Sequence, residues 1–181
     1  MLRNLLTIDE AYTCRLRVAE KPGVLRDLAI LFAHSGDSWI WLPGLALLGW
    51  FGPSGWRERC VWMIVGIVIT ALIVFSIKLT VRRRRPEGEW GGIYRLTDPH
   101  SFPSGHAARA VMLAVLGFGL GPAWFGLVLL VWAPLVVLAR VAMGVHYLSD
   151  VLAGTLLGLA IGLAVLWVFL RVNPLISQLI F

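Results

Sequence analysis

Two histidines lie where polar stretches meet long apolar ones, and they are the residues best suited to chemistry. His106 ends a Pro-Ser-Gly-His tetrapeptide and directly precedes a mostly apolar run to Leu120. His146 lies four residues before Asp150, at the start of the last apolar run. On a helix this spacing places both side chains on one face, where the carboxylate could accept a hydrogen bond from one ring nitrogen and leave the other as a base or nucleophile. The alternative is that Asp150 is an N-cap and His146 an interfacial anchor.

The tetrapeptide also predicts an anion site. The first N–H groups of a helix have no partner within the helix, and the helix dipole is positive at that end. Gly105 would allow a ligand to approach closely, and Ser104 and His106 would lie beside it. Ordinary capping by Ser104, with Gly105 for clearance, explains the same residues equally well.

Three cations accompany these residues. Arg140 ends an apolar stretch, where an Arg costs about 2.5–3.5 kcal/mol on insertion scales and normally has an anionic partner. That partner could be a lipid headgroup or a substrate phosphate. Lys78 lies inside an apolar run and could either snorkel or point into a polar site. Arg85 closes a run of four arginines, of which Arg82, Arg83 and Arg84 are expected to anchor the chain to the membrane by charge.

These groups together predict a phosphoryl-transfer site. The three cations and the helix-end N–H groups would hold a phosphoryl group and stabilise the charge of its transition state. One histidine would attack phosphorus and the other would protonate the leaving oxygen, while Asp150 orients the attacking ring. Because no group of His, Cys, Asp or Glu has metal-ligand spacing, we predict no metal and no other cofactor.

The composition is typical of an integral membrane protein. Hydrophobic residues make up 59% of the 181 and charged residues 14%, with a mean hydropathy of +0.81, whereas soluble domains average about 45–50% and 25%. The net charge of +6 therefore favours anionic lipid headgroups over nucleic acid as the partner. Cys14 and Cys60 form neither a disulfide nor a metal pattern.

Hydropathy predicts an all-α, polytopic membrane helix bundle. Spans of about 20 mainly apolar residues are expected near Val61–Leu79, Ala107–Leu120, Trp124–Ala139 and Val151–Leu170, with a short fifth at Trp39–Phe51. Residues 4–33 mix charged and apolar positions, which predicts one or two amphipathic interfacial helices broken at Lys21-Pro22-Gly23. A sixth span would result if Val24–His34 entered the membrane. We expect a single domain, 1–181, with an interfacial segment 1–36 and a catalytic transmembrane bundle 37–181.

Span parity brings the polar segments together. The helix after His106 crosses away and the next one returns, so residues 78–106 and 140–150 can meet at one face. Under five spans that face carries thirteen of the 16 Lys and Arg residues, and the positive-inside rule would place it in the cytoplasm. Several of these cations are candidate ligands and therefore poor topology markers, so the side of the membrane stays open.

The motifs resemble those of the type 2 phosphatidic acid phosphatase superfamily of membrane lipid phosphatases. The family pattern is Lys-x6-Arg-Pro, then Pro-Ser-Gly-His, then Ser-Arg-x5-His-x3-Asp, and the chain matches it at each part except that Ala139 replaces the Ser. The resemblance implies that His146 is a nucleophile oriented by Asp150 and that His106 is the general acid. It implies phosphate binding by Lys78, Arg85, Ser104, Gly105 and Arg140. His34 and His100 match nothing in the pattern and are expected to be structural.

The resemblance implies metal-independent dephosphorylation of a membrane lipid phosphate or diphosphate through a phosphohistidine. Phosphatidic acid, phosphatidylglycerol phosphate and undecaprenyl diphosphate are the candidate substrates, and a bacterial cytoplasmic (inner) membrane is the expected location. Transfer of the phosphoryl group to an acceptor other than water, and a non-catalytic lipid-binding protein, are the alternatives. Vanadate-dependent haloperoxidases have a similar oxyanion cradle but are soluble, which this hydropathy disfavours. The sequence predicts no oligomeric state.

Overall fold

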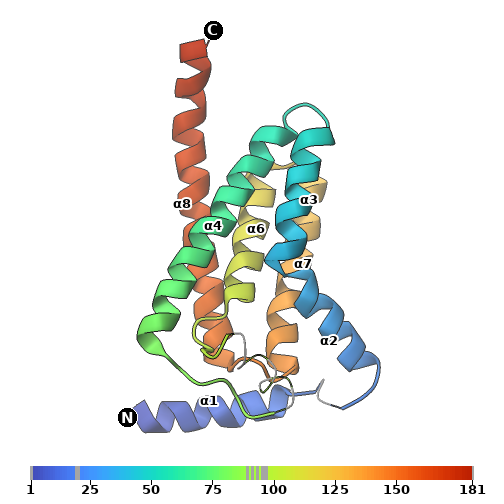
Figure 1. Cartoon of the computed structure of the whole chain (residues 1–181), viewed down its shortest axis with the longest axis vertical. Coiled ribbons are helices and arrows are strands. Elements are labelled where there is room, and N and C mark those ends of the chain that lie inside the picture. Colours follow the sequence, from blue (N-terminus) through green and yellow to red (C-terminus); the bar gives the residue numbers. More distant parts are fainter. Residues whose placement is uncertain are drawn as a thin grey trace.

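The computed structural model describes residues 2–18, 21–88, 90, 92, 94 and 98–180, with side chains described from residue 7 to residue 172. Within these ranges the chain is helical apart from loops and one isolated bridge between Arg84 and His100. The helices are α1 Leu2–Leu16, α2 Val24–Ser35, α3 Ser38–Phe51, α4 Trp56–Val81, α6 Gly105–Leu120, α7 Ala123–Ala142 and α8 Leu148–Ile180 (Figure 1). The predicted all-α class is confirmed.

Helix α6 is the centre of the bundle and packs against α4, α7 and α8. Most of its residues are buried, including Ala107, Ala108 and Met112. Three glycines of α8, at 154, 158 and 162, face it at i,i+4 spacing. A Cβ on Gly158 would lie 2.1 Å from the carbonyl oxygen of Ala108, so only glycine permits this close backbone approach. The glycine stripe therefore holds α8 and its site residues tightly against the start of α6.

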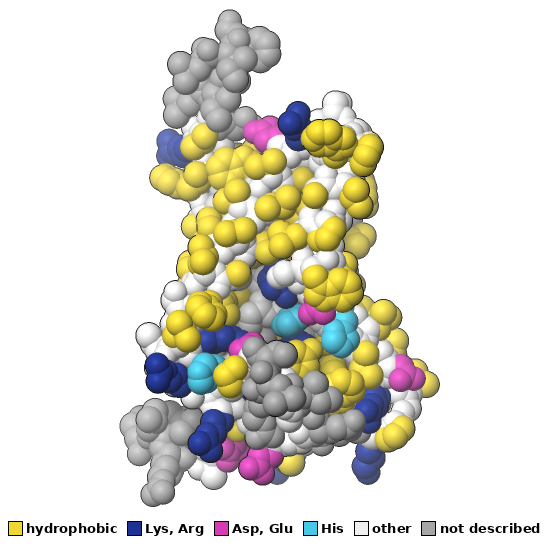
Figure 2. All heavy atoms as spheres, in the orientation of Figure 1, with side chains coloured by type: hydrophobic (Ala, Val, Ile, Leu, Met, Phe, Trp, Pro, Cys, Tyr) yellow, Lys and Arg dark blue, Asp and Glu magenta, His cyan; other side chains and the backbone are white. Residues whose placement is uncertain are grey.

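Three helices are long and apolar enough to cross a membrane, namely α4, α7 and α8 through Val172. Helices α3 and α6 are apolar but shorter, with 14 and 16 residues. At 1.5 Å per residue α6 is roughly 24 Å long, less than the ~30 Å hydrocarbon core. On the face in view, hydrophobic side chains form a broad band over the upper part of the molecule, bordered by a few charged side chains above and by more of them at the lower end (Figure 2). The chain is an integral membrane protein, while the number of spans stays a prediction.

The helices extend further than hydropathy predicted. Helix α4 begins at Trp56 and not Val61, and α8 begins at Leu148 and not Val151. The added residues include charged ones such as Arg57 and Asp150, which an apolar window excludes but a helix accommodates. The predicted break at residues 21–23 is confirmed, because α1 ends at Leu16 and α2 begins at Val24.

Helix α1 lies across the lower end of the bundle, nearly perpendicular to the long helices (Figure 1). Two of its side chains bind the start of α8. The Asp9 carboxylate accepts a hydrogen bond from the Ser149 N–H at 3.0 Å, and the Thr13 hydroxyl accepts one from the Leu148 N–H at 3.0 Å. The predicted interfacial helix is therefore fastened to the segment that carries His146 and Asp150.

Candidate active site

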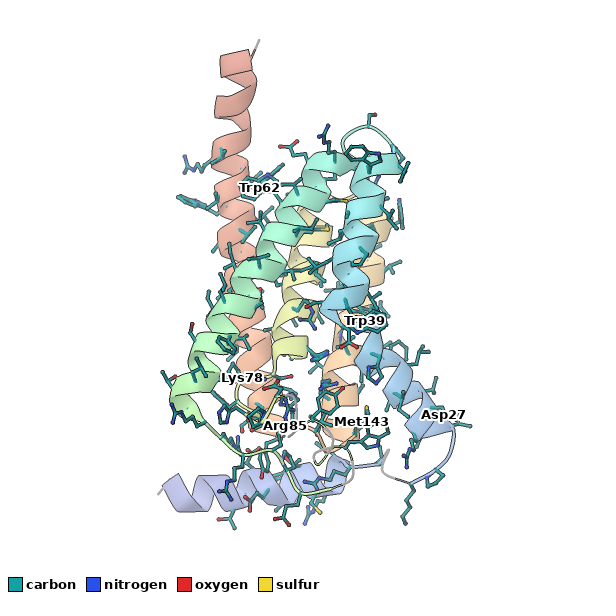
Figure 3. All side chains as sticks on the ribbon, in the orientation of Figure 1. Asp27, Trp39, Trp62, Lys78, Arg85 and Met143 are labelled. Carbon is teal, nitrogen blue, oxygen red and sulfur yellow. The ribbon has the colours of Figure 1, made fainter. Side chains whose placement is uncertain are left out.

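One cavity at the lower end of the bundle is lined by residues from all three motifs. Its volume is about 370 Å³, and its walls include Lys78, Gly105, His106 and His146. In the space-filling view the molecule is hollowed between the apolar band and the lower end, with basic and histidine side chains inside (Figure 2). Lys78 and Arg85 lie at this same lower end (Figure 3). The prediction that residues 78–106 and 140–150 meet is confirmed, because His106 and His146 line one cavity.

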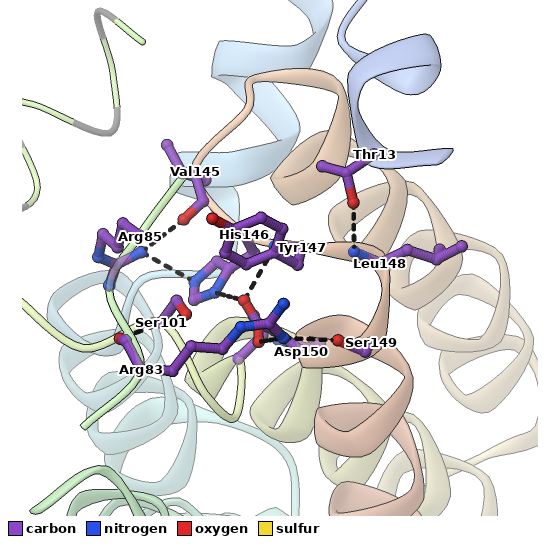
Figure 4. Close-up of polar contacts among 12 residues, drawn as sticks. Thr13, Arg83, Arg85, Ser101, Val145, His146, Tyr147, Leu148, Ser149 and Asp150 are labelled. Atoms are coloured by element: carbon purple, nitrogen blue, oxygen red, sulfur yellow. Dashed lines mark hydrogen bonds and ion pairs between the residues drawn. The ribbon is translucent and has the colours of Figure 1, made fainter. Parts of the chain in front are cut away.

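His146 lies in the turn between α7 and α8 and not on a helix. The helical-face argument for its pairing with Asp150 was wrong in this detail, since only Asp150 lies within α8. The turn nevertheless brings the His146 Nδ1 atom to 3.6 Å from Asp150 Oδ2, which is longer than a hydrogen bond, and Nδ1 has no hydrogen-bond partner among the described residues. On the other side of the ring, Arg85 donates from Nη1 to His146 Nε2 at 3.1 Å (Figure 4). Nε2 therefore accepts, which places the ring proton on Nδ1, facing the carboxylate.

The surroundings of His146 keep its imidazole neutral. The side chain is 1% exposed, and burial lowers its pKa well below 6.5, with further lowering by the charges of Arg85, Arg140 and Lys78. A neutral ring with an unprotonated Nε2 facing three cations is the state that a nucleophile toward phosphorus needs.

Asp150 connects three parts of the site. Its carboxylate accepts a hydrogen bond from the Tyr147 N–H at 2.9 Å, so it also caps the first turn of α8. Its backbone carbonyl accepts from the Ser104 N–H at 3.0 Å, which joins the Pro-Ser-Gly-His turn to α8. Asp150 is the third residue of α8 and not its N-cap, so the N-cap alternative was wrong, although the side chain does bind a backbone N–H at the start of the helix.

Arg83 also binds Asp150, a contact that the sequence analysis did not predict. The guanidinium donates to Asp150 Oδ1 at 2.8 Å (Figure 4). It also donates to Asp9 Oδ2 of α1 at 2.7 Å and to the Ser149 hydroxyl at 2.6 Å. Anchoring to the membrane by charge was therefore the wrong interpretation for Arg83, because its guanidinium binds side chains at the site. The Arg82 side chain is exposed, and among the described residues its guanidinium donates a hydrogen bond only to the nearby Leu79 carbonyl.

We expect Arg83→Met to lower kcat by about 10-fold or more, since small misplacements of catalytic groups can cost up to ~10²-fold. The change removes the cation that holds Asp150 and leaves the ring of His146 less firmly oriented. Steady-state phosphate release measures the effect, and Arg82→Met in the same arginine run is the matched control, expected to stay within about twofold of wild type. Equal losses in both variants would contradict the assignment.

Lys78 and Arg85 converge on a carboxylate that the sequence did not single out. Asp98 Oδ2 accepts hydrogen bonds from Lys78 Nζ and, at 2.8 Å, from Arg85 Nη2. The Asp98 side chain is 41% exposed, while those of Lys78 and Arg85 are 9% and 1% exposed. Burial would raise the pKa of Asp98, but the bond to Lys78 and the charges of both cations lower it overall. An anionic oxygen therefore binds where the two cations would bind a phosphate oxygen.

We expect Asp98→Asn to lower the inhibition constant of inorganic phosphate by about 10-fold, which corresponds to ~1.4 kcal/mol. The neutral amide competes less strongly for the two cations, and the bond from Arg85 Nε to the Asp98 carbonyl remains available. Inhibition of turnover by added phosphate gives the measurement. Glu87→Gln, an exposed change in the same loop, controls for charge alone. Weaker phosphate binding in Asp98→Asn would show that Asp98 supports the site and does not compete for it.

Arg140 is the most deeply buried cation of the cluster, with no exposed surface. Nη1 donates to the Tyr94 hydroxyl at 3.3 Å, and the guanidinium lies 4.8 Å from the centre of the same ring. Within the described part of the chain, Nε and Nη2 have no hydrogen-bond partner. A buried guanidinium with two unsatisfied donors is suited to an anion that brings its own acceptor oxygens.

The start of α6 completes the site. The hydroxyl of Ser104 accepts from the Ala107 N–H at 3.5 Å and so forms the N-cap, as the capping alternative predicted. Gly105 borders the cavity, where its N–H group is among those that α6 leaves without an internal partner. His100, expected to be structural, lines the same cavity. His34 binds Asp37, whose carboxylate also binds His106.

Comparison with known proteins supports this reading of the motifs. The model of the PAP2 superfamily matches residues 59–174. The undecaprenyl-diphosphatase of Sulfolobus acidocaldarius is 32% identical over 138 residues, which cover 74% of this chain and 66% of that protein. The decaprenylphosphoryl-5-phosphoribose phosphatase of Mycobacterium tuberculosis is 36% identical over 149 residues, or 80% of each chain.

Solved structures give the same result for the fold. The PAP2-type phosphatidylglycerolphosphate phosphatase of Bacillus subtilis superimposes with a TM-score of 0.72 at 26% identity, covering 90% of this chain and 84% of that one. LpxE of Aquifex aeolicus gives a TM-score of 0.67 at 26% identity, covering 83% and 92%. The chain therefore belongs to the PAP2 superfamily and is an enzyme of the lipid phosphatase class.

Proposed function

We propose that the protein hydrolyses a phosphate monoester or diphosphate of a membrane lipid, using His146 as the nucleophile. The observation that carries the proposal is the chemical asymmetry of the cavity. Its polar lining includes Lys78, His106 and His146, whereas Ala71, Val74, Phe75 and Leu79 of α4 line it with apolar side chains. Phe75 and Leu79 are exposed on the outer surface of the bundle, where lipid would lie. A ligand that fits both kinds of lining has a phosphate group on an apolar tail.

The proposed bond-making steps use both rings. His146 Nε2 attacks phosphorus, so that an N–P bond forms as the bond from phosphorus to the leaving oxygen breaks. His106 donates its proton to that oxygen, and the dephosphorylated lipid departs. Water then attacks the phosphohistidine and gives a proton to His106, which releases inorganic phosphate and restores both rings.

The cations and amides stabilise these steps electrostatically. Lys78, Arg85 and Arg140, with the hydroxyl of Ser104 and the amide of Gly105, would hold the non-reacting phosphoryl oxygens. Such preorganised donors contribute more in a buried site than in water, because no solvent must reorganise as charge develops. Asp150 would stabilise the protonated Nδ1 of His146 as its Nε2 becomes bonded to phosphorus.

Purified protein in detergent, supplied with a panel of lipid phosphates, tests the proposal. Because the relatives named above include polyprenyl-lipid phosphatases, the panel contains polyprenyl phosphates and diphosphates as well as phosphatidic acid and phosphatidylglycerol phosphate. Release of inorganic phosphate in step with loss of substrate supports hydrolysis. Appearance of a phosphorylated acceptor in place of inorganic phosphate would favour phosphotransfer, and lipid binding without any turnover would favour the non-catalytic alternative.

We place the enzyme in a bacterial cytoplasmic membrane, with the site at one water-facing end of the bundle. Cysteine-accessibility labelling of a position in the 82–103 loop, in intact cells, assigns that end. Labelling by an impermeant reagent places the site outside, and labelling only after permeabilisation places it in the cytoplasm.

A further inference from the structure

The corner between α2 and α3 lies directly over His106. Asp37 is the residue that precedes α3, and its Oδ1 atom accepts a hydrogen bond from His106 Nε2 at 2.5 Å. Its second oxygen, Oδ2, binds His34 Nδ1 and Trp39 Nε1, each at 3.0 Å. The Asp37 side chain is 14% exposed. One nearly buried carboxylate thus joins the candidate general acid to a histidine for which the sequence analysis found no role.

The corner is held in place by contacts from two other helices. Arg109 of α6 donates from Nε and Nη2 to the Gly36 carbonyl at 2.8 and 2.5 Å. Trp132 of α7 donates to the Ser35 hydroxyl at 2.9 Å. A Cβ at residue 36 would lie 3.0 Å from Val136 and 3.5 Å from His106, so the glycine allows the corner to approach this closely. The position of Asp37 is therefore built into the packing of the bundle.

The surroundings of His106 give this contact its importance. Burial of the ring, and then the positive charges of Arg140 and Arg109, disfavour its protonated form, whereas the Asp37 carboxylate that faces the ring favours it. A protonated imidazole between two guanidinium groups is unfavourable unless an anion compensates. Burial would raise the pKa of Asp37, but its bonds to His106, His34 and Trp39 lower it overall, so the carboxylate stays ionised.

We propose that Asp37 is the positioning residue of His106: it holds the ring by Nε2, stabilises its protonated form and leaves Nδ1 to serve the leaving oxygen. The inference rests on the proposed function. In the first step the Nδ1 proton passes to the leaving oxygen as the bond to phosphorus breaks, and Asp37 stays ionised throughout. In the second step water returns a proton to Nδ1. Each histidine of the site then has its own carboxylate, Asp150 for His146 and Asp37 for His106.

Asp37 lies outside residues 59–174, the region matched by the family model. It lies in the corner between an amphipathic helix and a short apolar one. Hydropathy predicts a change of segment there but gives no role to an individual residue. The corner between α2 and α3 would then contribute to catalysis, because it carries the residue that positions His106 and stabilises its protonated form.

Leaving-group dependence separates this role from a structural one. We compare Asp37→Asn with wild type on dodecyl phosphate and on a dodecyl-substituted nitrophenyl phosphate, which share the apolar tail. The alkoxide needs a proton as it leaves and the nitrophenolate does not. We expect kcat/KM to fall by about 10²-fold for dodecyl phosphate, as for loss of general acid catalysis, and by less than about threefold for the nitrophenyl ester. His106→Ala should show the same selectivity.

Two further variants make the outcome decisive. Asp27→Asn, an exposed acidic residue of the same helix pair, should leave both rates unchanged. His146→Ala should eliminate turnover of both esters, and if it does not, the proposed function fails independently of Asp37. An equal loss on both esters in Asp37→Asn would show that Asp37 only maintains the fold, and no loss on either would show that His106 needs no carboxylate; each result overturns the proposal.

Discussion

Replacing His146 by Asn is expected to lower phosphate release by at least about 10³-fold, because the change removes the nucleophile and no other described group could replace it in the same position. Arg85 donates a hydrogen bond to Nε2 of the ring, and Nδ1 lies 3.6 Å from Asp150, so each ring nitrogen faces a charged group of the site. Asparagine keeps a polar group of similar reach and limits the disturbance to the packing.

The measurement is single-turnover phosphate release from the preferred lipid of the panel. Thermal unfolding in detergent confirms that the variant is folded. Asp150→Asn is expected to fall between this variant and wild type, because it spares the nucleophile but not its orientation. Residual activity in His146→Asn within about tenfold of wild type would mean that another group attacks phosphorus.

Replacing Arg140 by Met should change activity and stability in opposite directions. Loss of a preorganised cation from the phosphate site is expected to lower kcat/KM by about 10²–10³-fold. Two donor atoms of Arg140 are buried with no partner among the described residues, and each such group costs ~1–3 kcal/mol. The Met variant should therefore have a higher Tm than wild type in the absence of substrate, although it loses the stacking on Tyr94.

The same variant should shift the pH profile. With His146 as the proposed nucleophile, activity is expected to require its neutral form and to be lost as the pH falls through the pKa of that ring. Burial, Arg85, Arg140 and Lys78 keep this pKa below 6.5. Removal of Arg140 takes away one of the charges that lower it, so the acidic limb of kcat/KM should move to higher pH. Arg57→Met, an exposed change in the first turn of α4, should alter neither activity nor pH profile. Lower stability of Arg140→Met would show that Arg140 supports the fold more than the site.

The sequence predicted the parts of the site that depend on local spacing. The three motifs placed Lys78, Arg85, His106 and His146 on one membrane face by span parity alone, and the structure brings these residues to one end of the bundle, with Arg85 in contact with His146. Ser104 was recognised as a possible N-cap from its place before an apolar run. The roles of these residues in catalysis stay predictions that the variants above test.

The carboxylates that bind the cations and histidine of the site could not be predicted in the same way. Asp9, Asp37 and Asp98 lie 74, 69 and 13 residues from the cations and histidine that they bind, namely Arg83, His106 and Arg85. Nothing in the local sequence distinguishes them from other interfacial acidic residues, because their partners are set by the packing of helices. The i,i+4 spacing of the α8 glycines does not by itself identify α6 as the helix that they face.

Trapping the phosphoryl group on the protein tests the central claim most directly. His106→Ala, given the dodecyl-substituted nitrophenyl phosphate, should form the phosphoenzyme without needing an acid and then hydrolyse it slowly, because the group that accepts the proton from water is missing. Alkaline quenching and peptide mass spectrometry should find one phosphoryl group, on His146. A phosphoryl group on any other residue, or burst-free turnover with an unmodified His146, would contradict the account.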